Sequence, residues 1–135
     1  MWFTNYNLRG KKRNMDVFKL CDSEYKFINV IWDAEPVNST NLVKLCADKL
    51  GWKKSTTYTM LRRLAEQGFV KNENATVTAL VKREQIQRYE AEAFMGKVFN
   101  GSIPSFLVSF LHDKTLTETE ANEIQRLIKE ATKNG

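Results

Sequence analysis

The side chains best suited to chemistry in this sequence are hydroxyls and cations gathered between residues 53 and 63. On a helical wheel with Leu61 at the centre of the buried face, Thr59 and Arg63 lie on the opposite side. Arginine can bond guanine through two hydrogen bonds, hydroxyls can bond bases or phosphates, and lysines suit phosphates. We therefore predict that this segment contacts DNA, together with one lysine from a later β-rich run. The predicted residues are Lys53, Lys54, Ser55, Thr56, Thr59, Arg62 and Arg63 from the segment, and Lys71 from the later run.

The charge distribution agrees with a polyanionic partner for the middle of the chain. The 135 residues hold 21 Lys and Arg against 16 Asp and Glu, a formal net charge of +5. Residues 51–85 hold seven basic and three acidic side chains, a local charge of +4, whereas residues 86–135 hold six and seven, or −1. A basic middle followed by a nearly neutral tail favours nucleic-acid binding by the former.

Two other interpretations of the basic segment stay open. Its charges could form an ordinary solvated helix face, or the helix could bind a protein partner in a module that does not recognise specific DNA. Salt dependence separates these possibilities, because a DNA complex releases counterions and weakens steeply with salt. A mostly apolar protein contact does not.

Catalysis and metal binding find little support in the sequence. His112 is the single histidine, and no serine or cysteine motif accompanies it as a nucleophile would require. Glu90 and Glu92 stand two residues apart on an expected helix and cannot face each other. Cys21 and Cys46 are expected to pack as small apolar side chains. We therefore expect no catalytic residue, no metal ligand and no cofactor.

Composition places the chain among compact, mainly helical proteins. Apolar residues make up 42% and aromatic residues 11%, while only 6 Gly and 2 Pro are available for turns. No apolar run approaches the ~18 residues of a membrane helix, and residues 1–14 lack the apolar stretch of a secretory signal. With two cysteines and no disulfide framework, a cytoplasmic protein without a membrane partner is expected.

Helical periodicity and capping residues then define the elements that must position the basic face. Helices are predicted over residues 22–32, 39–50 and 54–67. Asn38 or Ser39 caps the second helix, Gly51 ends it, and Gly68 ends the third. Two β-rich runs, at 69–71 and 76–81, surround a turn predicted at 72–74. Three helices followed by a hairpin is the order of a winged helix-turn-helix domain.

The remainder of the sequence is predicted to be helical. One helix covers residues 82–99, a second covers about 103–111 with Pro104 in its first turn, and a third follows a capping box at Thr117–Glu120. Three short amphipathic helices bury too little to close a core of their own. Either the winged domain or a second copy of the chain must therefore cover them, and we expect the second copy. The residues predicted to form this homodimer are Phe94, Val98, Phe106, Leu107, Phe110, Leu111, Ile124, Leu127 and Ile128.

The predicted fold class is thus mostly α with a small β-hairpin. Residues 18–81 are expected to form a winged-helix DNA-binding domain, and residues 82–135 a helical dimerisation region. Residues 1–17 match no element and are expected to be a disordered arm. Met15 offers an alternative translation start, which would make residues 1–14 an upstream extension.

Three segments resemble the penicillinase-repressor family. Residues 20–32, LCDSEYKFINVIW, are similar to its opening helix, and residues 52–64, WKKSTTYTMLRRL, resemble its tryptophan-led recognition helix. Residues 94–110, with Asn100-Gly101-Ser102 inside them, resemble its dimerisation region. The resemblance implies a homodimeric winged-helix repressor of a palindromic operator. It also implies an inducing membrane sensor or protease, with the family's cleavage junction aligned at Ala93–Phe94.

The sequence departs from the family pattern at several of these positions. Lys53 and Lys54 stand where the family usually has Ser and Pro, and Cys21 replaces the usual Ser at the start of the first helix. The family's Asn before the cleaved bond is Ala93 here. No cysteine follows Cys46, so the copper-sensing cysteine cluster of one branch of the family is missing.

Overall fold

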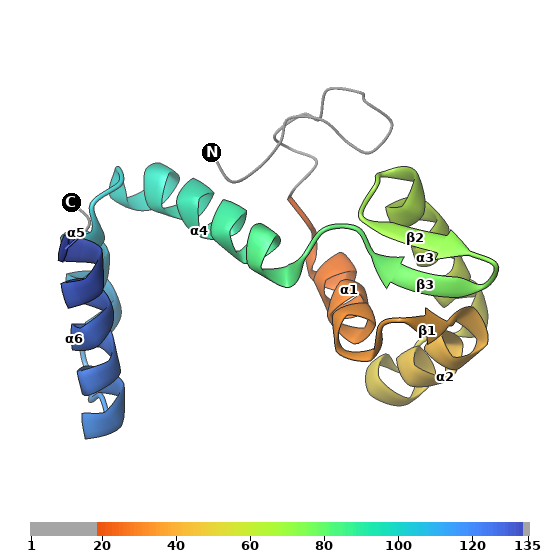
Figure 1. The fold of residues 1–135 in the computed structure, drawn as a ribbon, viewed down its shortest axis with the longest axis horizontal. Coiled ribbons are helices and arrows are strands. Elements are labelled where there is room, and N and C mark those ends of the chain that lie inside the picture. Colours follow the sequence, from red (N-terminus) through yellow and green to blue (C-terminus); the bar gives the residue numbers. More distant parts are fainter. Residues whose placement is uncertain (1–18, 134–135) are drawn as a thin grey trace. The chain divides into compact units, whose positions relative to one another are not determined.

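The computed structural model describes residues 19–133 of the chain. The arm predicted at residues 1–17 lies outside these residues. Within them the chain forms six helices and three strands (Figure 1): α1 (Asp22–Ala34), β1 (Val37–Asn38), α2 (Ser39–Leu50), α3 (Lys54–Glu66), β2 (Val70–Glu73), β3 (Thr76–Ala79), α4 (Arg83–Phe99), α5 (Ile103–Leu111) and α6 (Glu118–Lys133). The predicted fold class, mostly helical with a small sheet and a winged-helix order, is confirmed.

The chain divides into two compact units, one up to Ala93 and the other from Phe94. We call them the winged unit and the C-terminal unit. The division lies inside α4, later in the chain than the domain boundary predicted between residues 81 and 82. The domain boundary between residues 81 and 82 stays a prediction.

Local signals set the limits of the first two helices. The Glu24 carboxylate accepts a hydrogen bond at Oε1 from the backbone N–H of Cys21, at 2.8 Å, and so closes the first turn of α1. Asn38 Oδ1 accepts from Thr40 N at 2.8 Å and caps α2, and Gly51 ends it with a φ of 70°. Both predicted limits of α2 are confirmed.

The sheet corrects two predictions. It has three antiparallel strands in the order β1–β3–β2, whereas the sequence predicted a two-stranded hairpin. β1 is only two residues long, too short for periodicity to reveal, and it exists because Val37 pairs with Val77. The hairpin turn lies at Asn74 and Ala75, both with positive φ, and not at residues 72–74. Two left-handed residues match the twist of the paired strands.

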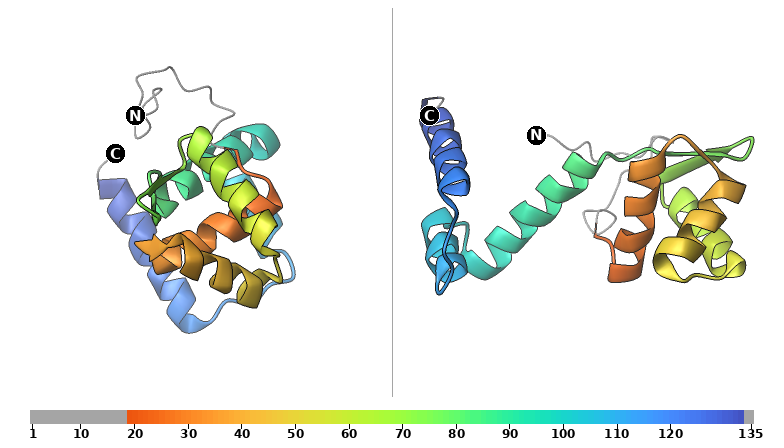
Figure 2. Two further views of the ribbon diagram at one scale, coloured as in Figure 1. Left: turned by 90° about the vertical axis from the view of Figure 1, so that its right-hand side faces the viewer. Right: turned by 90° about the horizontal axis from the view of Figure 1, so that it is seen from below.

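The core of the winged unit lies between α1, α2, α3 and the sheet. Figures 1 and 2 show the sheet along one side of the three helices. The fully buried side chains include Phe27, Ile28 and Ile31 of α1, and Leu42 of α2. One of the two cysteines departs from its prediction. Cys46 is buried, as predicted, and burial raises the pKa of its thiol. Cys21 is exposed, because it precedes the first turn of α1 and does not face the core.

The beginning of α4 belongs to the same core. Ile86 is fully buried and Tyr89 nearly so. The indole N–H of Trp32 donates to the carbonyl of Val81 at 2.9 Å. The Arg83 guanidinium donates to Asp33 Oδ1 at 2.6 Å and lies 5.3 Å from the centroid of the Trp32 ring. These contacts anchor the start of α4 to the end of α1.

The C-terminal unit consists of the end of α4 with α5 and α6. Ser102 Oγ accepts from Ser105 N at 3.2 Å and caps α5. Thr117 and Glu120 exchange backbone-to-side-chain bonds of 3.1 Å, which confirms the predicted capping box before α6. A chain of ring contacts joins its phenylalanines at centroid distances of 5.4–5.7 Å: Phe94, Phe99, Phe106 and Phe110. No side chain between residues 94 and 132 is buried.

Candidate nucleic-acid interface

Helix α3 is held by packing at its start and along one side. Trp52, just before the helix, stacks on Phe27 at 5.6 Å between ring centroids, and its backbone N–H donates to the Cys46 carbonyl at 3.2 Å. Trp52 therefore packs on α1. The buried side chains of the helix are Thr57, Met60, Leu61 and Leu64. The helical wheel did not place Met60 on the buried face, which is wider than expected because α3 contacts both α2 and β2.

The opposite side of α3 is exposed. Each side chain predicted to touch DNA from this segment is exposed: Lys53, Lys54, Ser55, Thr56, Thr59, Arg62 and Arg63. The structure thus brings these hydroxyls and cations onto one accessible helix. Their contact with DNA stays a prediction.

The beginning of α3 is open to an anion. Lys53 occupies the N-cap, and no side chain among residues 19–133 caps the helix there. The first backbone N–H groups of a helix have no partner inside it and carry its positive dipole end, which suits a phosphate oxygen. Lys53 and Lys54 add two exposed positive charges at the same place.

The hairpin contributes one cation. Lys71 on β2 is exposed, and its Nζ lies 3.9 Å from Glu73 Oε2 on the same strand. An exposed pair at this distance is weak and readily exchanged for another partner. Lys71 can therefore still contact a phosphate.

The two arginines of α3 differ in their surroundings. Arg63 Nη1 lies 3.7 Å from Oε2 of Glu24, whose side chain is only 10% exposed. Arg62 is exposed, and within residues 19–133 it has no ion pair or hydrogen bond through its side chain. This asymmetry cannot be read from the helical wheel, because the partner of Arg63 comes from α1.

Comparison with known proteins identifies the family. The penicillinase repressor family matches residues 20–130 of the 135. The chain belongs to the penicillinase repressor family. Among its relatives are the methicillin resistance regulatory protein MecI of Staphylococcus aureus (strain Mu50), with 24% identity over 82% of this chain and 94% of MecI, and the penicillinase repressor of Bacillus licheniformis, with 23% identity over 83% and 91%.

A solved structure of the multiple antibiotic-resistance repressor MarR from Listeria monocytogenes is also similar to the chain. It shares 24% identity, covers 90% of this chain and 79% of that one, and superposes with a TM-score of 0.48.

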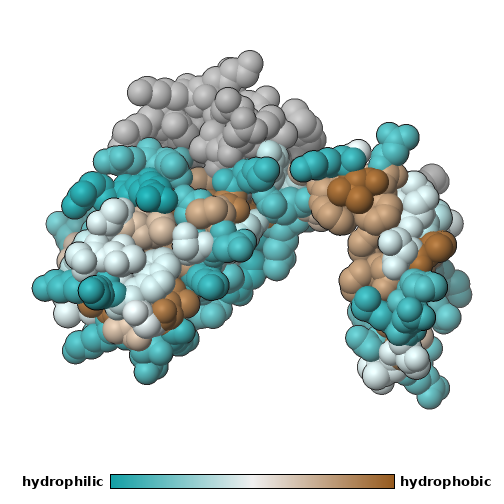
Figure 3. Space-filling view, turned by 180° about the vertical axis from the view of Figure 1, so that it is seen from behind, coloured by the Kyte–Doolittle hydropathy of each residue, from teal (hydrophilic) through white to brown (hydrophobic). Residues whose placement is uncertain are grey.

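The apolar surface of this family member lies in its C-terminal unit. Within the described residues every strongly exposed large apolar side chain comes from this unit: Phe94, Val98, Ile103, Val108, Phe110, Leu127 and Ile128. Figure 3 shows the brown surface that gathers on it. The other residues predicted for the dimer, Phe106, Leu107, Leu111 and Ile124, are half-buried. Sequence reasoning missed Ile103 and Val108, because α5 is apolar on almost every side and its periodicity does not reveal a free face.

The junction that the resemblance aligns with the family's cleavage site has a defined place. Ala93 and Phe94 are both exposed, lie inside α4, and are the residues at which the two compact units meet. Both are in helical conformation.

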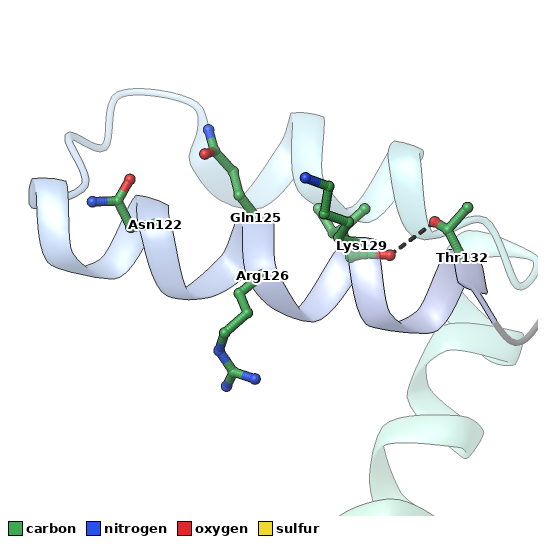
Figure 4. Close-up of a pocket in the computed structure, with 6 residues that line it drawn as sticks. Asn122, Gln125, Arg126, Lys129 and Thr132 are labelled. Carbon is green, nitrogen blue, oxygen red and sulfur yellow. Dashed lines mark hydrogen bonds between the residues drawn. The ribbon is translucent and has the colours of Figure 1, made fainter.

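The remaining surface features are modest. An open groove on α6 is lined by Asn122, Gln125, Arg126, Ile128, Lys129 and Thr132, and Figure 4 shows Arg126 pointing away from Gln125 and Lys129. Arg126 pairs with Glu123 and Glu130 of its own helix. Among residues 19–133 no group of three His, Cys, Asp or Glu side chains could hold a metal ion, and no helix is long and apolar enough to cross a membrane.

Proposed function

We propose that the chain is a sequence-specific transcriptional repressor that binds a palindromic DNA operator as a homodimer, with α3 in the major groove. The observation that carries this proposal is the exposed face of α3, where hydroxyls, two arginines and a helix N-terminus that no side chain among residues 19–133 caps occur together on a helix held by a buried core. Membership in the penicillinase repressor family supports a DNA-binding repressor.

The residues divide by the chemistry that they offer. Ser55, Thr56, Thr59 and Arg62 would lie against base edges, since hydroxyl and guanidinium groups match the donors and acceptors of the major groove. Lys53, Lys54 and Lys71 would contact phosphates on either side and set the register of the helix.

The dimer would form through the C-terminal unit. Its apolar residues are left exposed by the residues that the structure describes, 19–133, and a second copy would bury them in a self-complementary interface. A dimer of winged units would then read two half-sites separated by one helical turn of DNA, ~34 Å, or by a multiple of it.

A second candidate function is a winged-helix module that binds a protein and has no preferred DNA sequence. The −1 charge of residues 86–135 and the apolar C-terminal unit are compatible with it. The +4 charge of residues 51–85 favours the repressor instead.

Fluorescence anisotropy distinguishes the two. A labelled duplex from upstream of the protein's own gene is titrated at two salt concentrations, with scrambled duplex as competitor. The repressor requires a Kd on the order of 10 nM that survives the competitor and weakens steeply with salt. Micromolar binding that does not depend on the DNA sequence would contradict the repressor and favour the protein-binding module.

A further inference from the structure

Glu24 joins the first turn of α1 to the recognition helix. One carboxylate oxygen accepts from Cys21 N at 2.8 Å, and the other lies 3.7 Å from Arg63 Nη1. Glu24 is 8% exposed although it belongs to the first turn of its helix. A buried carboxylate requires a positive partner, because removal of a charge from water is costly without one. Arg63 supplies that partner.

Arg62 and Arg63 are neighbours in sequence with the same chemistry, and both are exposed. Only Arg63 is bound to a buried anion. An arginine whose charge is already balanced by a carboxylate adds little to the counterions released from DNA, since its field at a phosphate is offset by that of its partner. Arg62 has no such partner within residues 19–133 and keeps its full charge.

We propose that Glu24 is a positioning residue that withholds Arg63 from DNA and leaves Arg62 as the arginine of α3 that contacts it. The proposal rests on the proposed function, in which α3 enters the major groove. It replaces the equal roles that the sequence predicted for the two arginines. Glu24 would thereby limit affinity for arbitrary DNA, because a free Arg63 would add a sequence-independent phosphate contact.

Four variants of the full chain test the proposal: Glu24→Gln, Arg63→Gln with Glu24→Gln, Arg62→Gln, and Arg63→Gln alone. Glutamine at position 24 keeps an oxygen for the Cys21 N–H and removes only the charge. The double variant leaves no buried charge unpaired, so it remains interpretable where Arg63→Gln alone unfolds. Circular dichroism and the thermal midpoint establish that each variant is folded.

The quantity measured is the slope of log Kobs against log salt concentration on scrambled and operator duplexes. Glu24→Gln is expected to steepen the slope on scrambled DNA by ~0.9, the contribution of one additional phosphate contact. The double variant is expected to return to the wild-type slope. Arg62→Gln, the matched neighbour, is expected to weaken operator binding about tenfold and to leave the slope on scrambled DNA near that of the wild type, because in the proposed function Arg62 contacts base edges and not phosphates.

Two results would overturn the proposal. A double variant whose slope is flatter than wild type by ~0.9 would show that Arg63 already contacts DNA in the native protein. A Glu24→Gln variant with the wild-type slope, or one whose steeper slope persists in the double variant, would show that Glu24 does not act through Arg63. Wild-type protein without salt-sensitive DNA binding is a different result, because it removes the proposed function itself.

Discussion

Between residues 19 and 93 the large apolar side chains are buried or half-buried around one core, whereas between residues 94 and 132 none is buried and several are exposed. The winged unit gathers its core from helices and strands that are distant in sequence, and each covers the others. The C-terminal unit has three helical segments and several phenylalanines but closes no interior. Apolar residues therefore have two different roles in this chain: they stabilise one unit from within and leave the other dependent on a second surface.

The largest expected effect comes from a charge on the apolar surface of α6. Leu127→Asp should abolish the dimer, because it buries an unpaired carboxylate at the interface at a cost of several kcal/mol. Analytical ultracentrifugation at micromolar concentration measures the result. Gln125→Asp is the control, since it puts the same charge on the polar side of the helix. A Leu127→Asp protein that still sediments as a dimer would contradict the proposed interface.

A core truncation compares the two units directly. Phe27→Ala should lower the free energy of unfolding by about 3–5 kcal/mol, because Phe27 is fully buried and stacks on Trp52. Its effect should not depend on protein concentration. Phe110→Ala in the C-terminal unit should lower the free energy of unfolding by an amount that increases as the protein is diluted, because dilution dissociates the dimer that this residue would stabilise. Denaturant titrations at two protein concentrations measure both, and equal concentration dependence would remove the distinction between the units.

The attachment of α4 can be tested with a smaller change. Trp32→Phe keeps an aromatic ring under Arg83 and removes the hydrogen bond to the Val81 carbonyl, with an expected cost of about 1 kcal/mol. Hydrogen exchange should then increase around Ile86 and Tyr89 and stay unchanged in α5 and α6. Equal increases in both regions would show that the start of α4 is not part of the winged core.

The smallest effect concerns pH. Burial, with a lesser contribution from the Glu90 charge, raises the pKa of Tyr25 to about 12. Between pH 10 and 12 the unfolded chain loses this proton while the folded chain keeps it, so stability is fully present below pH 10 and falls as pH rises. Tyr25→Phe should remove that part of the decline, roughly 1 kcal/mol after allowance for solvent screening. The difference between the two unfolding curves measures it, and parallel curves would refute the shift.

Much of the helical structure in both units follows from local signals. The helix limits set by Asn38, by Gly51 and by the Thr117–Glu120 box depend only on residues within one turn of the same helix, so the sequence predicts them. The sequence also predicts the exposed face of α3, because that face lies opposite the buried side chains on a helical wheel. The sequence did not predict β1, because a strand of two residues is too short to show an alternating pattern. It did not predict the burial of Met60, because that burial depends on which elements pack against α3 and not on the sequence of α3 itself.

The sequence by itself thus determined which segments are helical, where most of them begin and end, and which side of α3 carries cations and hydroxyls. Those features depend on residues within a few positions of one another. Only the tertiary structure decided that Arg63 meets Glu24, that the start of α4 packs on α1, and that Val37 and Asn38 add a third strand to the sheet. These depend on residues that are far apart in the chain and are brought together by the burial of a shared core, which no local pattern encodes.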